Sequence, residues 1–271
     1  MKKILITVIL SVAIFSLVTA QGRQFKLSKK TGTLKVNLSG VKIEGYDGNE
    51  VIFSAPEQKQ EQKDERAEGL KLISGSGLTD NTGLNLSVQE NGGNIDVDYV
   101  GKTDRDLITI KVPNSMSVKI TENDVINAAR SVDIKDFKGE LEISTMYNNI
   151  SLNNVTGPIN AKTIYGNLTA KFASTLKGPI SLVSIYKFVD VAIPINLKAN
   201  VNISTKYGNI YAADGLDIKK DVLKEKKNSD GEDLTGLTDL SRSSDIKGTL
   251  NGGGLDLILK SSFGKIYLRK N

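Results

Sequence analysis

Thr163-Ile-Tyr-Gly-Asn-Leu168 is one copy of a short phrase that recurs five times in the second half of the chain. Each copy follows a stretch in which apolar and polar residues alternate, a pattern typical of a β-strand. Copies are separated by about 20 residues, apart from a longer interval before the last one, and a repeat of this length predicts a β-solenoid. One such unit can bury its apolar side only against its neighbours. We therefore expect an all-β fold, a right-handed single-stranded parallel β-helix.

The same alternation predicts which side chains of the phrase face the interior. Successive side chains of a strand point to opposite faces, so the hydroxyl residue and the aromatic residue of each copy should both point inward. Stacked coils bring equivalent residues to about 4.8 Å from one another. We expect an interior hydroxyl ladder of Thr145, Thr163, Ser184, Thr205 and Ser261, beside an interior structural ladder of Tyr147, Tyr165, Tyr186, Tyr207 and Phe263.

The residue after each aromatic predicts a corner between two strands. It is Asn148, Gly166, Lys187, Gly208 and Gly264 in the successive copies. Glycine, and after it asparagine, tolerates a positive φ, so we expect a left-handed residue at each corner. Lys187 departs from this pattern, which predicts a distorted third corner.

A candidate partner surface follows from the residue between the hydroxyl and the aromatic, which should point outward. Met146, Ile164 and Ile185 occupy this position in the first three copies, and Val183 lies beside Ile185 on the same face. Stacking would make these four residues an exposed apolar stripe, and contiguous exposed apolar patches are often interaction sites. The alternative is that a flanking segment covers the stripe.

The chain begins with the pattern of a secretory signal peptide. Residues 1–20 contain Lys2-Lys3, a run of mostly apolar residues and small residues before Gln21, which predicts export and cleavage after Ala20. The run is short for a membrane span of about 20 residues, although a retained anchor is the alternative. No cysteine stands at the cleavage site to carry a lipid. We expect a periplasmic, cell-surface or secreted protein that is not a lipoprotein and has no transmembrane segment after cleavage.

The rest of the chain divides into two parts. Residues 21–112 should form an irregular β-rich start with a charged loop at 55–69. Residues 113–271 should form the regular coils, with a charged insertion at 214–247 that has little apolar periodicity.

Composition excludes several kinds of chemistry. The chain has no histidine and no cysteine, so it has no Ser-His-Asp or Cys-His site and no histidine-based metal site. We expect no cofactor and no metal. Without Lys2 and Lys3 the formal net charge falls from +5 to +3 (34 basic against 31 acidic residues), which is too weak and too evenly spread to predict a nucleic-acid partner. Asp96 and Asp98 share one face of a predicted strand, so a polysaccharide lyase or glycoside hydrolase is the alternative function. An alternating strand must also place polar residues outward, which explains the same pair without catalysis.

Three phrases together resemble the bacterial putative-adhesin family, an exported domain of unknown function common in Bacteroides-type bacteria. They are Val112-Pro-Asn114, Val155-Thr-Gly-Pro-Ile159 and Asn251-Gly-Gly-Gly254, each followed by a strand-like stretch. The resemblance covers about residues 100–271 and implies a parallel β-helix with an irregular start, without a catalytic motif. It implies an adhesin, or a scaffold that binds a protein or glycan of the cell envelope. The insertion at 214–247 departs from the regular pattern.

Overall fold

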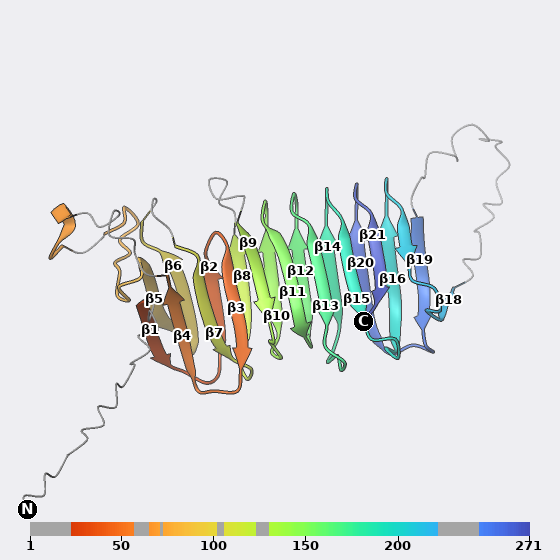
Figure 1. Cartoon of the computed structure of the whole chain (residues 1–271), viewed down its shortest axis with the longest axis horizontal. Coiled ribbons are helices and arrows are strands. Elements are labelled where there is room, and N and C mark those ends of the chain that lie inside the picture. The colour runs from red at the N-terminus through yellow and green to blue at the C-terminus, as the bar shows by residue number, and fades with distance from the viewer. Residues whose placement is uncertain (1–22, 57–64, 71–72, 102–105, 123–129, 222–243) are drawn as a thin grey trace, which may run out of the picture.

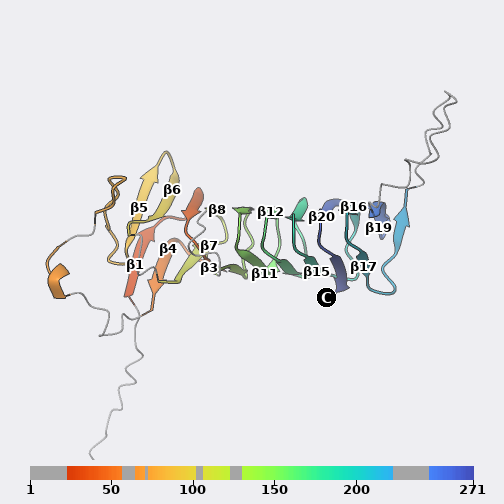
Figure 2. The same ribbon diagram turned by 90° about the horizontal axis from the view of Figure 1, so that it is seen from above.

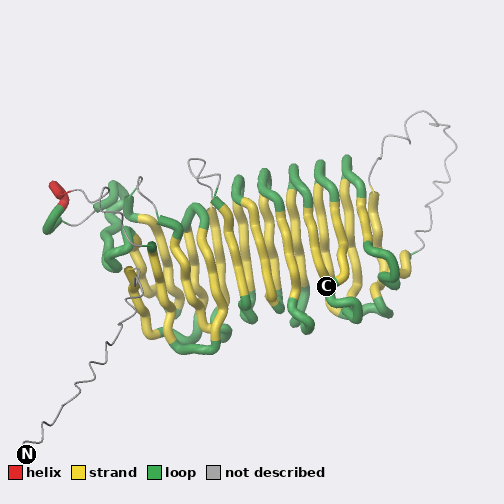
Figure 3. The backbone as a smooth tube through the Cα atoms, viewed as in Figure 1, coloured by secondary structure: helices red, strands yellow, loops and turns green. Residues whose placement is uncertain are grey.

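The computed structural model describes residues 23–56, 65–70, 73–101, 106–122, 130–221 and 244–271. Over these residues the protein is all-β, with two large mixed sheets and one short 3-10 helix, η2 (Glu65–Ala67). The sheets lie face to face and form an elongated stack (Figures 1, 2 and 3). The predicted signal peptide and most of the predicted charged loop lie outside the described residues.

The 11-stranded sheet has its strands in an order that differs from their order in the chain. In space they are β18 (Ile218–Lys220), β19 (Ser244–Leu250), β16 (Ala199–Thr205), β20 (Leu255–Ser261), β14 (Ile180–Ser184), β12 (Ile159–Thr163), β10 (Leu141–Thr145), β8 (Ser117–Glu122), β2 (Thr33–Asn37), β6 (Asn94–Tyr99) and β5 (Leu86–Asn91).

The 10-stranded sheet faces it and is ordered in a corresponding way. From one edge to the other it contains β1 (Arg23–Ser28), β4 (Glu50–Ala55), β7 (Ile108–Pro113), β3 (Val41–Tyr46), β9 (Ser131–Lys135), β11 (Asn149–Val155), β13 (Leu168–Phe172), β15 (Val189–Ile193), β21 (Ile266–Lys270) and β17 (Ile210–Ala212).

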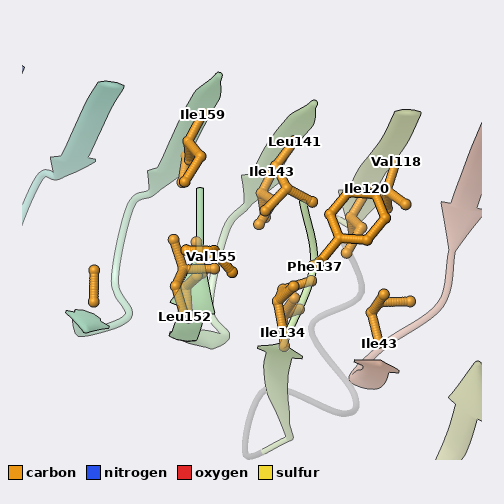
Figure 4. Packing of buried hydrophobic residues seen from close by; sticks show 14 of the residues in the cluster. Ile43, Val118, Ile120, Ile134, Phe137, Leu141, Ile143, Leu152, Val155 and Ile159 are labelled. Atoms are coloured by element: carbon orange, nitrogen blue, oxygen red, sulfur yellow. The ribbon is translucent and has the colours of Figure 1, made fainter. Parts of the chain in front are cut away.

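The core lies between the two sheets and is built by the alternation seen in the sequence. In β12 the side chains of Ile159, Ala161 and Thr163 are buried, whereas Asn160 and Lys162 are exposed. The facing strands bury side chains with the same period of two residues, so both sheets contribute to one continuous apolar cluster. Figure 4 shows part of this interior, where aliphatic side chains of both sheets point toward one another and Phe137, from the turn after β9, packs among them.

Consecutive strands of the repeat alternate between the sheets. β10, β12 and β14 are parallel neighbours in one sheet, and β11, β13 and β15 are parallel neighbours in the other. The pairing is in register with the repeat, so that Thr145 lies beside Thr163 and Thr163 beside Ser184. Each copy of the phrase therefore spans the passage from the 11-stranded to the 10-stranded sheet.

We call a pair of consecutive strands, one in each sheet, a rung. Two rungs that come from near the ends of the chain lie inside the stack. β20 lies between β14 and β16, and β21 lies between β15 and β17. At the other end, β2 lies between β6 and β8, and β3 lies between β7 and β9. The coils therefore do not stack in chain order, because the fifth copy of the phrase lies between the third and the fourth.

Antiparallel pairs occur at both ends of the stack, which also departs from a purely parallel helix, although β17 at the edge of the 10-stranded sheet pairs with β21 in parallel. β1 pairs with β4, β4 with β7 and β5 with β6 at one end, while β19 pairs with β16 and β18 at the other. Such pairs cover strand edges that would otherwise be open to other chains. β18 and the start of β19 come from the predicted insertion at 214–247, so its described parts belong to the sheet. No helix among the described residues has the length and apolar content needed to span a membrane.

Candidate functional site

Each hydroxyl residue of the phrase ends its strand and closes a turn. Thr163 is fully buried; its Oγ1 accepts a hydrogen bond from the N–H of Gly166 (3.1 Å) and donates one to the carbonyl of Asn148 (3.0 Å). The first bond turns the chain, and the second ties the turn to the neighbouring rung. Ser184, Thr205 and Ser261 make the same two kinds of bond. The hydroxyl ladder is therefore interior, as predicted.

The aromatic residues point outward, which corrects the predicted interior ladder. Tyr165, Tyr186, Tyr207 and Phe263 are 44%, 45%, 56% and 50% exposed, and Tyr147 is half-buried. Alternation holds only while the chain is extended, and the strand ends at the hydroxyl residue. The aromatic residue then lies within the turn, where the chain reverses toward the other sheet. These turns lie along the upper rim of the stack in Figure 1.

The five rings form one continuous stack, which we call the aromatic row. Neighbouring ring centroids are 5.2 Å apart for Tyr147 and Tyr165, 4.9 Å for Tyr165 and Tyr186, 4.9 Å for Tyr186 and Phe263, and 5.0 Å for Phe263 and Tyr207. The angles between ring planes are 12°, 7°, 5° and 18° in the same order. The rings therefore cover each other's faces and present their edges to solvent.

The backbone explains this spacing. The N–H of Tyr165 donates to the carbonyl of Met146 (2.8 Å), and the N–H of Tyr186 donates to that of Ile164 (3.0 Å). The parallel ladder thus continues through the turns, so the rings inherit the spacing of strands in a sheet, about 4.8 Å.

The corner glycines serve a purpose other than the predicted one. Gly166, Gly208 and Gly264 do not have positive φ, so the expectation of left-handed corners is wrong. A Cβ on Gly166 would lie 1.9 Å from the carbonyl oxygen of Asn148, and one on Gly208 would lie 2.0 Å from that of Gly264. Glycine is needed here because backbones of neighbouring rungs approach closely. At the third corner, the N–H of Lys187 still bonds Ser184 Oγ (3.2 Å).

The predicted aliphatic stripe is only half-exposed. Met146, Ile164, Val183 and Ile185 are each partly buried, whereas the aromatic rings beside them are more open. The predicted stripe and the aromatic residues lie at the same edge of the molecule, and the aromatic side chains are the more exposed of the two. The missed signal is the hydroxyl residue followed three positions later by a glycine, which is typical of a turn closed by a side-chain oxygen.

Positive charge surrounds one half of the aromatic row. Lys187, Lys206 and Lys265 belong to the same turns and are exposed, and Lys206 Nζ lies 5.3 Å from the ring centroid of Tyr207. The turn segments 145–149, 163–167, 184–188, 205–209 and 261–265 contain no aspartate or glutamate. The row is thus a positively charged edge without a carboxylate in its turns.

The acidic pair proposed for catalysis lies far along the stack, on β6. Asp96 accepts a hydrogen bond from Asn91 (2.8 Å) and lies 3.6 Å from Lys35 Nζ. Asp98 accepts a hydrogen bond from Asn37 (2.8 Å). Each carboxylate thus bonds a side chain of a neighbouring strand, and the described residues contain no group of three acidic side chains arranged to hold a metal.

An open cavity of about 570 Å³ lies at the C-terminal end of the stack, between β17 and the β18–β19 pair. Tyr211, Lys220 and Asp245 are among the residues that line it. Tyr211 also stacks on Tyr267, with ring centroids 5.4 Å apart. This pair of tyrosines lies apart from the aromatic row and provides a control for it.

Comparisons with known proteins give little further information. No protein-family model matches the chain, and no curated protein matches it. A similar solved structure is the crystal structure of a putative cell adhesion protein from Clostridium sporogenes, which is 11% identical. The match covers 93% of this chain and 100% of the other, with a TM-score of 0.41. This similarity supports no assignment of function.

Proposed function

We propose that this chain is an exported, non-enzymatic β-solenoid that binds a component of the cell envelope through its aromatic row. This function is that of an adhesin or an envelope scaffold, in agreement with the family resemblance of the sequence. The solenoid interpretation rests on the alternation of successive strands between the sheets and on their in-register parallel pairing. The antiparallel pairs then act as caps at the two ends.

The aromatic row is the observation that carries the binding function. Four of its five rings are among the most exposed large apolar side chains of the described residues. An apolar surface that is contiguous and repeated at one edge is typical of an interaction site. The rings lie outside both the buried apolar cluster and the interior hydroxyl ladder.

A binding screen tests this function. The mature protein is passed over a glycan array and a panel of purified envelope proteins, beside the double variant Tyr165→Ser/Tyr186→Ser. We expect at least one ligand that the wild type retains and the double variant loses. Tyr211→Ser is the matched control, because it removes an exposed, stacked tyrosine away from the row. If every retained ligand binds the double variant equally well, the row is not the binding surface.

Export has its own test. Expression of the full chain in a bacterial host, followed by N-terminal sequencing of the processed protein, should give a mature chain that starts at Gln21. An uncleaved chain that stays in the membrane fraction would support the retained anchor instead.

The enzymatic alternative rests on the shared face of Asp96 and Asp98. It predicts that the protein depolymerises a polysaccharide, with new reducing ends that appear over time. If such turnover occurred and Asp96→Asn/Asp98→Asn abolished it, the non-enzymatic part of the proposal would be wrong.

A further inference from the structure

We infer that the ligand of the aromatic row is an acidic polysaccharide that lies along the rim of the stack, one sugar unit to each rung. This inference rests on the proposed function and specifies its chemical class. It follows from which parts of the rings are accessible, from the charges beside them and from the spacing of the row.

The stacking geometry determines which part of each ring a ligand can reach. The ring planes are within 18° of parallel and their centroids are at most 5.2 Å apart, so neighbouring rings cover every face except the outer faces of Tyr147 and Tyr207. Aromatic rings carry negative charge on their faces and positive charge at their edges. The row therefore presents its positive edges, whereas neutral sugars and nucleic-acid bases bind aromatic side chains by stacking on faces.

The phenol groups add hydrogen-bond donors along the same line. Tyr147, Tyr165, Tyr186 and Tyr207 each carry a hydroxyl group that has no hydrogen-bond partner among the described residues. A phenolic O–H donates readily to a carboxylate or sulfate oxygen, and such charge-assisted bonds are stronger than neutral ones. Phe263 leaves one gap in this line of donors.

Three lysines complete the preference for anions. Lys187, Lys206 and Lys265 lie in the turns of the row, and none of them forms an ion pair with a described residue. No carboxylate is present in the five turns to offset them. A polyanion that lies along the row would have a phenol or an ammonium group within the turn of every rung.

Spacing favours a polysaccharide over an acidic peptide. The rings repeat every 4.9–5.2 Å. Side chains on one face of an extended peptide repeat every 6.6–6.8 Å or so, and would lose register with the rings within two rungs. A pyranose unit in a linear chain is close in length to one rung, so successive sugar units can stay level with successive rungs, although neighbouring units turn their charged groups to different sides.

Affinity electrophoresis of the mature protein tests the inference. The gels contain polygalacturonate, or its methyl-esterified form as a neutral polymer with the same backbone. We expect polygalacturonate to retard the wild type and the ester to leave it unretarded. Tyr165→Ser/Tyr186→Ser and Lys187→Gln/Lys206→Gln/Lys265→Gln should each weaken binding at least tenfold, with far-UV circular dichroism as the check of folding.

The matched control removes three exposed lysines from the outer faces of the sheets: Lys162→Gln/Lys171→Gln/Lys260→Gln. This variant should bind like the wild type. Equal loss in both lysine triples would show non-specific charge attraction and overturn the inference.

Other ligands separate the inference from the proposed function. If the row binds polyglutamate, anionic phospholipid vesicles or a neutral glycan in a Tyr165- and Tyr186-dependent way and does not bind polygalacturonate, the polysaccharide class is wrong and the binding function stands. If no ligand depends on these tyrosines, both are wrong.

Discussion

Thr163→Val should destabilise the protein although the new side chain has nearly the same shape. The hydroxyl group accepts a hydrogen bond from the Gly166 N–H at 3.1 Å and donates one to the Asn148 carbonyl at 3.0 Å, in a fully buried position. Valine leaves the Gly166 N–H without its partner, and a buried unsatisfied group costs about 1–3 kcal/mol. The Asn148 carbonyl loses one bond, worth about 0.5–1.5 kcal/mol, and keeps the bond from Thr145 Oγ1 (3.3 Å). The added methyl group recovers about 0.8 kcal/mol. The expected net loss in the free energy of unfolding is therefore about 1–4 kcal/mol.

Urea denaturation followed by far-UV circular dichroism measures this loss. Thr163→Ser retains the hydroxyl group and should lose only about 1 kcal/mol for the missing methyl group. Thr169→Val is the control, because Thr169 is exposed on the outer face of the sheet. Its Oγ1 makes a long hydrogen bond, of 3.5 Å, to the carbonyl of Ile150. A Thr163→Val variant as stable as Thr169→Val would refute the role of the hydroxyl ladder in holding the turns.

Two further predictions concern a corner glycine of the aromatic row and the pKa of Asp47. Gly166→Ala should lower the free energy of unfolding by about 1–3 kcal/mol, because its methyl group would lie 1.9 Å from the Asn148 carbonyl oxygen. Gly75→Ala, which has open space around it, should change this free energy by no more than about 0.5 kcal/mol. Thermal denaturation compares the two variants, and equal melting temperatures would contradict the close approach. A hydrogen bond from Asn114, together with Lys138, holds the pKa of Asp47 below its usual value. The stabilisation from these contacts is therefore fully present above the usual pKa of an aspartate, and it is lost as the pH falls through the lowered pKa of Asp47. Carboxyl NMR titration should show the pKa of Asp47 rising toward its usual value in Asn114→Ala, and an unchanged titration would contradict the assignment.

Local alternation made the strands and their buried faces predictable. The Ile159, Ala161 and Thr163 side chains are interior, as their spacing requires, because burial on one face acts on every second residue of an extended chain. The same rule failed at Tyr165, because the strand ends at Thr163. The Gly166 N–H then donates a hydrogen bond to Thr163 Oγ1, so Tyr165 lies within a turn and not in an extended segment. The direction of the aromatic side chain is set by this bond, which alternation does not describe.

The order of the rungs could not be read from the sequence. β20 has the same pattern of inward apolar residues as β16, so either could pack beside β14 with a similar burial of surface. What distinguishes them is the neighbour on the far side, where β19 runs antiparallel to β16. The segment of the chain that leads from β16 to β19 is long, and its sequence is charged and has little apolar periodicity. The sequence therefore gives no signal for this pairing.

The position of the last rung affects how the protein can be made. β20 and β21 come after β16 and β17 in the chain, yet they lie between β14–β15 and β16–β17. A nascent chain that lacks residues 255–271 cannot complete the interior of the stack, whereas a simple array can assemble progressively from its first repeat. These contacts join segments far apart in the chain, and such topologies fold slowly. This part of the stack can therefore be completed only after residues 255–271 have been synthesised, although its neighbouring strands precede them in the chain.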